Sequence, residues 1–201
     1  WRQDYDLMSG LIGIGVYLLE RLPHPLAVTG LEQIVDRLTE LAVQHPDGIT
    51  WWTAPAWLAP DGRVQLPHGC YDLGVAHGIA GVIAFLGQVC QALSGRSDAT
   101  VSARALLDSA VAWLLAQQLP STAPSRFPTW VQPDGTRPPS RLGWCYGPAG
   151  VIEADHVLGV DVVGGAGVDP GHGNLIRRGG QGRPVENLRG RGARWPAGRG
   201  G

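Results

Sequence analysis

The residues that could do chemistry gather at short Gly-x-x-Gly turns. Cys145 and Tyr146 directly precede one of these turns, and the Cys145 thiol is a candidate metal ligand because zinc readily binds cysteine sulfur. His77 directly precedes another, where a histidine could act as a general acid or base near neutral pH. Arg141 lies four residues before Cys145 and could stabilise developing oxyanion charge. These residue types could support metal binding and acid–base chemistry.

Each of these residues also has a structural interpretation, which the sequence leaves open. A single cysteine is commonly a buried, unreactive thiol, and a histidine at a helix start is often simply hydrogen-bonded. A loop arginine such as Arg141 is usually solvated. Asp6 and Asp72 each lie a few residues before a turn, and the simplest role for either is an N-cap of the helix that follows.

The turns recur at a nearly constant spacing, which indicates a repeated structural unit. Their first glycines are residues 10, 78 and 147, so successive turns are 68 and 69 residues apart. Such a period is typical of folds that use one supersecondary unit several times. We therefore expect the residues that precede the turns, Ser9, His77 and Tyr146, to point toward a shared site.

The turns also begin apolar segments, each followed by an amphipathic one. Residues 5–22 and 74–93 are apolar on almost all sides, which predicts helices buried on several faces. Residues 26–45 and 99–118 place apolar side chains at helical spacing, which predicts helices with one exposed face. A further apolar helix is expected to start near residue 144. The alternation predicts an all-α fold, either an α/α barrel of inner and outer helices or a helical solenoid.

Long loops follow both amphipathic segments. Each loop contains a Pro-Asp-Gly turn signal, at residues 60–62 and 133–135, and we expect a short hairpin around such a turn. No other segment shows the alternation typical of a strand. Trp51, Trp52 and Trp57 lie in the first loop, and the sequence does not decide whether they bind a ligand or cover the core.

Composition indicates a soluble globular protein. The chain has 201 residues, 44% of them hydrophobic, with a formal net charge of −1. No apolar run reaches the roughly 18 residues of a membrane-spanning helix, and no signal peptide is visible. Its three cysteines cannot all pair, so a reducing compartment, the cytoplasm, is expected. The first residue is Trp1 instead of methionine, and we expect the chain to be a fragment.

The composition changes near residue 153, which predicts two parts. Residues 1–153 carry 9 Arg against 13 acidic residues, whereas residues 154–201 carry 7 Arg against 4 and hold 14 of the 30 glycines. We expect a helical domain over 1–153 and a disordered or frame-shifted tail over 154–201. The tail's charge is modest and its aromatic content low, so we expect no nucleic-acid partner.

At this point the sequence resembles the lanthionine synthetase C-like (LanC-like) cyclase family over residues 1 to about 153. The resemblance rests on three motifs: Tyr5-Asp6-Leu7-x-x-Gly10-x-x-Gly13, Gly74-Val75-Ala76-His77-Gly78-x-x-Gly81 and Arg141-x-x-Trp144-Cys145-Tyr146-Gly147-x-x-Gly150. It implies an α/α toroid with zinc at one end. The implied activity is lanthipeptide biosynthesis, in which cysteine thiols of a precursor peptide add to dehydroalanine or dehydrobutyrine and form thioether rings.

The resemblance also implies residue roles. It makes Cys145 a zinc ligand, and His77, Asp6 and Arg141 the catalytic residues. Trp144 and Tyr146 would line the substrate pocket. The implied partners are a dehydrated precursor peptide and a dehydratase domain or protein, and no transmembrane segment is expected.

One motif of the family is missing from this chain. The family completes its zinc site with a downstream Cys-His-Gly motif, but no cysteine follows Cys145, and His172 lacks a cysteine before it. Two hypotheses therefore stay open: an incomplete copy of the cyclase, or a non-catalytic remnant that binds peptides or thiols. An unrelated α/α-barrel glycosidase is disfavoured because no carboxylate pair is suitably placed.

Overall fold

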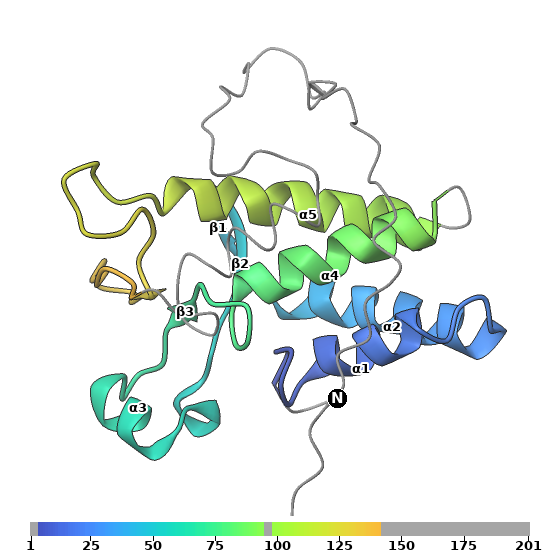
Figure 1. Cartoon of the computed structure of the whole chain (residues 1–201), viewed down its shortest axis with the longest axis horizontal. Coiled ribbons are helices and arrows are strands. Elements are labelled where there is room, and N and C mark those ends of the chain that lie inside the picture. Colours follow the sequence, from blue (N-terminus) through green and yellow to red (C-terminus); the bar gives the residue numbers. More distant parts are fainter. Residues whose placement is uncertain (1–3, 95–97, 142–201) are drawn as a thin grey trace, which may run out of the picture. The chain divides into compact units, whose positions relative to one another are not determined.

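The computed structural model describes residues 4–94 and 98–141 (Figure 1). Trp144, Cys145, Tyr146, the expected domain boundary near residue 153 and the tail lie outside these ranges. The helices are α1 (Leu11–Leu19), α2 (Pro25–Leu41), the 3-10 helix η1 (Pro55–Trp57), α3 (Pro60–Gln65), α4 (Ile79–Ala92) and α5 (Asp98–Ala116). The strands are β1 (Ala42–His45), β2 (Gly48–Trp51), β3 (Tyr71–Asp72) and β4 (Trp130–Val131).

The four long helices form two inner–outer pairs, as the repeat predicts. Helix α1 packs on α2 and α4 packs on α5, while the two inner helices α1 and α4 contact each other and the two outer helices α2 and α5 do the same (Figure 1). The described part of the chain is thus mostly helical with a few short strands. This arrangement confirms the expected partial toroid of alternating helices.

Helix α4 lies at the centre of the core. Its residues Ile79, Val82, Ile83, Phe85 and Leu86 are each at most 1% exposed, which explains why the segment is apolar on almost all sides. Helix α1 differs from this prediction, because it buries Leu11 and Ile12 but leaves Ile14 and Tyr17 exposed. In the described residues α4 and α2 cover only part of α1.

The hairpin of the first loop lies earlier than expected. Helix α2 ends at Leu41, not at residue 45, and the next four residues form β1, which pairs antiparallel with β2 in the register Ala42↔Trp51 and His45↔Gly48. Gly48 has a φ of +138°, a conformation that favours glycine. Residues 60–65, where we expected a hairpin turn, instead form helix α3 with proline at its start.

The second expected hairpin is present. Gly135 has a φ of +85° and its N–H donates to the Gln132 carbonyl over 2.9 Å, while Pro128 and Pro139 face each other in an antiparallel bridge. Strand β4, which lies just before this turn, also pairs with β3, with Asp72 opposite Trp130. This pairing fixes the segment that leads into helix α4.

Two of the three tryptophans of the first loop serve packing, whereas Trp57 is 38% exposed. Trp51 is 1% exposed, and its indole N–H donates to the Leu38 carbonyl over 2.9 Å, which ties the hairpin to helix α2. Trp52 packs edge-on against Tyr71. None of the described helices is long and apolar enough to cross a membrane.

Candidate functional site

The turn before α1 is held by its own backbone. The carbonyls of Asp4, Tyr5 and Asp6 accept the N–H groups of residues 11, 12 and 13 at 3.2, 3.2 and 3.4 Å, so they satisfy donors that a helix start leaves unpaired. The Asp4 carboxylate stabilises the turn by accepting the Tyr5 N–H at 2.7 Å and the Asp6 N–H at 3.3 Å. A Cβ on Gly10 would overlap this backbone, so the close approach requires glycine.

The turn before α4 is similar in its aspartate and glycine, but its backbone bonds differ, because the Gly78 N–H donates to the Gly74 carbonyl over 3.0 Å. The Asp72 carboxylate accepts the Gly74 N–H at 2.6 Å, two residues on, as Asp4 accepts that of Asp6. A Cβ on Gly78 would overlap the Asp72 carbonyl. The helix N-caps are Gly10 and Gly78, and neither has a side-chain cap. The N-cap role expected for Asp6 and Asp72 is therefore wrong, because the tight turn puts glycine at the cap and frees the carboxylates for other bonds.

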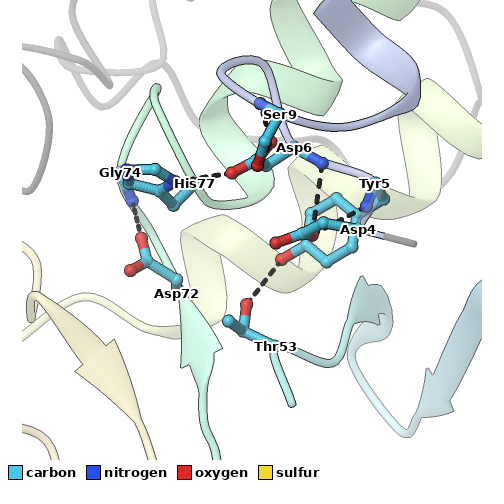
Figure 2. Close-up of polar contacts among 8 residues, drawn as sticks. All are labelled: Asp4, Tyr5, Asp6, Ser9, Thr53, Asp72, Gly74 and His77. Carbon is cyan, nitrogen blue, oxygen red and sulfur yellow. Dashed lines mark hydrogen bonds and ion pairs between the residues drawn. The ribbon is translucent and has the colours of Figure 1, made fainter. Parts of the chain in front are cut away.

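Asp6 and His77 join the two turns (Figure 2). The Leu7 N–H donates to the Ala76 carbonyl over 3.2 Å, and beside this bond Asp6 Oδ2 lies 2.5 Å from His77 Nδ1. The other carboxylate oxygen of Asp6 accepts from the Ser9 N–H at 2.7 Å and from the Ser9 hydroxyl at 3.2 Å. The packing of α1 on α4 thus makes one site of residues that are 71 positions apart.

The environment of the pair favours its charged form. Burial opposes the charge on Asp6, but the hydrogen bonds from His77 and Ser9 outweigh it and hold the Asp6 pKa below its usual range. The hydrogen bond to Asp6 raises the His77 pKa, despite the opposing effect of burial. The Asp6 side chain is 1% exposed and that of His77 is 34% exposed. The carboxylate is therefore buried beneath the imidazole, which is partly accessible to solvent.

Two further buried carboxyls flank the pair, and the sequence reasoning missed their importance. Burial raises the pKa of Asp72 to about 6, and burial together with the Asp6 charge raises that of Asp4 to about 6. The repeat could have pointed to Asp4, because it occupies the position of Asp72 one period of 68 residues earlier.

The remaining predicted site residues lie at or beyond the end of the described ranges. Arg141 is the last described residue and its side chain is exposed. Trp144, Cys145 and Tyr146 follow it and lie outside these ranges. Of the predicted catalytic residues, the structure therefore brings together Asp6 and His77.

The described residues do not offer a zinc site. No group of three or more His, Cys, Asp or Glu side chains within residues 4–94 and 98–141 is arranged to hold a metal. Cys70 is fully buried, and burial raises its pKa to about 12, so it stays a neutral thiol. The zinc expected from Cys145 thus has no ligand set in this part of the molecule.

Comparison with protein families identifies the family of this chain. The model of the lanthionine synthetase C-like protein family matches residues 2–154, which include both turns and the Asp6–His77 pair. The chain belongs to the lanthionine synthetase C-like family. A search of curated protein sequences finds no match.

A solved structure supports the fold. The chain is similar to a structure titled "Nisin cyclase", with a TM-score of 0.61 and 24% sequence identity, over 78% of this chain and 40% of that one. This likeness shows that the lanthionine synthetase C-like chain has a cyclase-type fold. The chain spans less than half the length of that cyclase.

Proposed function

We propose that this chain carries the acid–base part of a lanthionine cyclase site and that His77 delivers the proton that completes a thioether ring. The observation that supports the proposal is the hydrogen bond between His77 Nδ1 and the buried Asp6 carboxylate, within a chain of the lanthionine synthetase C-like family. The substrate would be a precursor peptide that contains dehydroalanine or dehydrobutyrine and free cysteines. A dehydratase domain or partner would have to supply these dehydro residues.

The reaction is an addition that needs no oxidant or reductant. The cysteine sulfur, after losing its proton to a base, attacks the β-carbon of the dehydro residue, so a C–S bond forms while the C=C π pair moves onto the adjoining carbonyl as an enolate. The protonated imidazole then gives a proton to the α-carbon, and the enolate pair forms the new C–H bond. The proton lost by the thiol replaces the one that the imidazole gave.

Asp6 prepares His77 for this step. Its hydrogen bond fixes the proton on Nδ1 and the orientation of the ring, so Nε2 is the nitrogen that exchanges a proton with substrate. The raised His77 pKa keeps the imidazolium populated near neutral pH. Ser9 in turn orients Asp6 through its N–H and hydroxyl groups. Such a positioned acid typically contributes about 10²–10⁴-fold to rate.

The proposal also gives roles to the predicted site residues other than Asp6 and His77. Arg141 would stabilise the enolate oxygen, and Trp144 and Tyr146 would line the pocket. Cys145 would be a thiolate ligand of zinc. Because the described residues provide no metal-ligand cluster, we derive no step through a metal. We expect the protein to work in the cytoplasm, where thiols stay reduced.

A second candidate is a peptide- or thiol-binding module that does not catalyse. The observation that favours it is the missing Cys-His-Gly motif, because no cysteine follows Cys145 in the printed sequence. In this case the Asp6–His77 pair would be retained for binding.

Ring closure by the purified 201-residue chain tests the first proposal. The substrate is a synthetic peptide with one dehydroalanine and one cysteine, and loss of free thiol is followed by alkylation and mass spectrometry. We expect closure faster than the spontaneous reaction, with one configuration at the new α-carbon because a fixed acid delivers the proton. His77→Gln should lose about 10²-fold or more of the added rate. The matched control is His68→Gln, because His68 is exposed in a loop.

The same samples distinguish the alternative. Bound zinc is measured by elemental analysis, and peptide binding by fluorescence anisotropy. Binding of the peptide without any acceleration would refute the cyclase proposal and support the binding module. Acceleration that survives His77→Gln would remove His77 from the mechanism.

A further inference from the structure

Asp72 is a buried carboxylate that the proposed proton transfer does not use. It is 4% exposed, and it ends strand β3, where it pairs with Trp130 of β4. The next N–H, that of Leu73, donates to the Thr129 carbonyl over 3.1 Å, so the backbone on both sides of the carboxylate is fixed. Burying an ionisable group costs free energy, and its surroundings must therefore explain why an aspartate stands here.

The Asp72 carboxylate holds the short loop in which His77 lies (Figure 2). Its Oδ1 accepts the Gly74 N–H at 2.6 Å. The same oxygen packs against Gly78, where a Cβ would come within 2.6 Å of it. The Gly78 N–H donates to the Gly74 carbonyl over 3.0 Å and so closes the loop of residues 74–78. One carboxylate thus contacts both ends of the loop that carries the imidazole.

The charges that act most strongly on His77 come from three aspartates. Asp6 bonds directly to the ring, whereas Asp72 and Asp4 act on it through their negative charge, Asp72 more strongly than Asp4. The effect is reciprocal, because the His77 charge favours the ionised forms of Asp72 and Asp4. Both carboxylates are at most 5% exposed, so water screens these interactions little.

We propose that Asp72 is a positioning residue for the proton transfer by His77. Its carboxylate holds the loop that orients the imidazole, and its negative charge keeps the imidazole protonated as the pH rises. Asp6 acts through a direct hydrogen bond, whereas Asp72 acts through the backbone of the loop and through space. The inference rests on the proposed role of His77 as the acid that completes the thioether ring.

The effect of Asp72 depends on pH in a definite direction. Burial raises the pKa of Asp72 to about 6. Well below pH 6 the carboxyl is neutral and adds no charge, whereas above pH 6 it is ionised and favours the imidazolium. The other titratable groups near Asp72 carry the same charge or stay neutral because burial raises their pKa; they are Asp4 and Asp6, and Tyr5 and Cys70. Asp72 therefore extends upward the pH range in which His77 can give a proton.

NMR titration of the His77 ring in Asp72→Asn tests the charge without any need for activity. Asparagine keeps an acceptor for the Gly74 N–H and removes the ionisable group. We expect the His77 pKa to fall, but less than in Asp6→Asn, which also loses the direct hydrogen bond. The ring signals are assigned by their loss in His77→Gln. Asp108→Asn is the matched control, because Asp108 is an aspartate of α5 whose pKa burial also raises, and its neighbour is Arg104. It should leave the His77 pKa unchanged.

The pH profile of ring closure tests the consequence for rate. Asp72→Asn and the parent chain are compared from about pH 6 to about pH 9 with the same dehydroalanine peptide. The ratio of the two rates cancels the titration of the substrate thiol, because the thiol is the same in both reactions. We expect a ratio near one at about pH 6, where the imidazole is protonated in both proteins. The ratio should fall about threefold to tenfold by pH 9, since a shift of one pKa unit changes the imidazolium population at most tenfold.

Asp72→Ala separates the structural part of the role. It removes the acceptor for the Gly74 N–H as well as the charge, so ring closure should slow at every pH, by about tenfold or more relative to Asp72→Asn. Circular dichroism shows whether this variant folds. Should it not fold, Asp4→Asn is the second variant, and it should lower the His77 pKa by less than Asp72→Asn does.

The outcomes are distinct. A lowered His77 pKa in Asp72→Asn, together with a rate ratio that falls as pH rises, supports the proposal. An unchanged His77 pKa overturns it, as does a rate ratio that is the same at every pH, which a purely structural role would give. A parent chain that does not accelerate ring closure refutes the proposed function instead, and the NMR titration still decides whether the Asp72 charge acts on His77.

Discussion

The turn before α1 (Asp4–Gly10) and the turn before α4 (Asp72–Gly78) share the positions of an aspartate and a glycine, although their backbone hydrogen bonds differ. Each begins with a buried aspartate that accepts the N–H of the residue two positions on, and each ends at a glycine N-cap in the extended region, with φ −114° at Gly10 and −130° at Gly78. In both, the N-cap glycine lies so close to the turn's backbone that a Cβ would not fit. The shared residues are those that make the turn.

The two turns differ where the chemistry lies. Asp6 of the first turn corresponds to Gly74 of the second, and Ser9 corresponds to His77. The hydrogen-bonded pair takes its carboxylate from one turn and its imidazole from the other. A repeated scaffold can therefore carry an asymmetric site, because the two turns contribute different side chains to the interface between α1 and α4.

The largest expected effect comes from replacing the N-cap glycines that the two turns share. Gly10→Ala and Gly78→Ala should each destabilise the fold by about 3 kcal/mol or more, because the new Cβ would overlap main-chain atoms that cannot move independently. Chemical denaturation followed by circular dichroism measures the loss. Gly62→Ala in α3 is the control, because its Cβ would meet Leu58 at an ordinary 3.4 Å. A small loss in only one of the two turns would show that the turns are not equivalent.

Asp72→Asn tests the aspartate of the second turn through the pH dependence of stability. The folded-state pKa of Asp72 is raised to about 6 from 3.8, so the folded state binds more protons than the unfolded state between these values and loses stability as pH rises through this window. Asparagine keeps an acceptor for the Gly74 N–H but does not ionise. Relative to the parent chain, the variant should gain about 2–3 kcal/mol between pH 4 and pH 7, at about 1.4 kcal/mol per pKa unit.

Urea titrations at several pH values measure this difference. The companion variant Asp4→Asn should show the same sign and a similar size, because burial and the Asp6 charge raise the Asp4 pKa to about 6 as well. Parallel pH profiles of Asp72→Asn and the parent chain would contradict the prediction.

Asp6→Asn breaks the asymmetric pair itself. Loss of the carboxylate removes the main cause of the raised His77 pKa, so the His77 pKa should fall, as measured by NMR titration of its ring protons. We expect a stability loss of about 2 kcal/mol at pH 6, because a charge-assisted hydrogen bond is replaced by a neutral one. Ser9→Ala is the matched control, because it removes one weaker contact to Asp6 and should move the His77 pKa less. An unchanged His77 pKa in Asp6→Asn would mean that Asp6 does not set its charge.

The sequence was a good guide to the repeat and to the residue types at its turns. The spacing of glycines 10 and 78 and the alternation of apolar and amphipathic segments predicted the inner and outer helices, because helix periodicity and glycine turns are local signals. The same spacing predicted that His77 points toward a site shared by the turns. It did not show that Asp6 would reach it, since a contact over 71 residues depends on the packing of α1 against α4.

The errors also have physical causes. The helical pattern of residues 26–45 continues into β1, and the Pro46-Asp47-Gly48 turn that ends this strand carries the same local signal as the Pro-Asp-Gly sequence at 60–62, which is helical. The N-cap role of Asp72 was wrong because the glycine at the cap cannot be distinguished from an ordinary loop glycine by local sequence. Neither the raised pKa of Asp4 nor the exposure of Tyr17 is local, because both depend on which elements cover them.

The smallest expected effect concerns Tyr5, where the two turns carry different residues that take no part in the Asp6–His77 pair. Tyr5 of the first turn corresponds to Leu73 of the second, and both are buried, but the Tyr5 hydroxyl lies 3.0 Å from Thr53 Oγ1 and donates to the Trp51 carbonyl over 3.3 Å. Tyr5→Phe should cost about 1 kcal/mol, the usual net contribution of such a bond, and leave the His77 pKa unchanged. Thermal denaturation of Tyr5→Phe, Thr53→Val and the double variant measures the coupling. If the two single losses simply add, the hydroxyl pair contributes nothing, and the tyrosine serves the first turn only as an apolar side chain, as Leu73 serves the second.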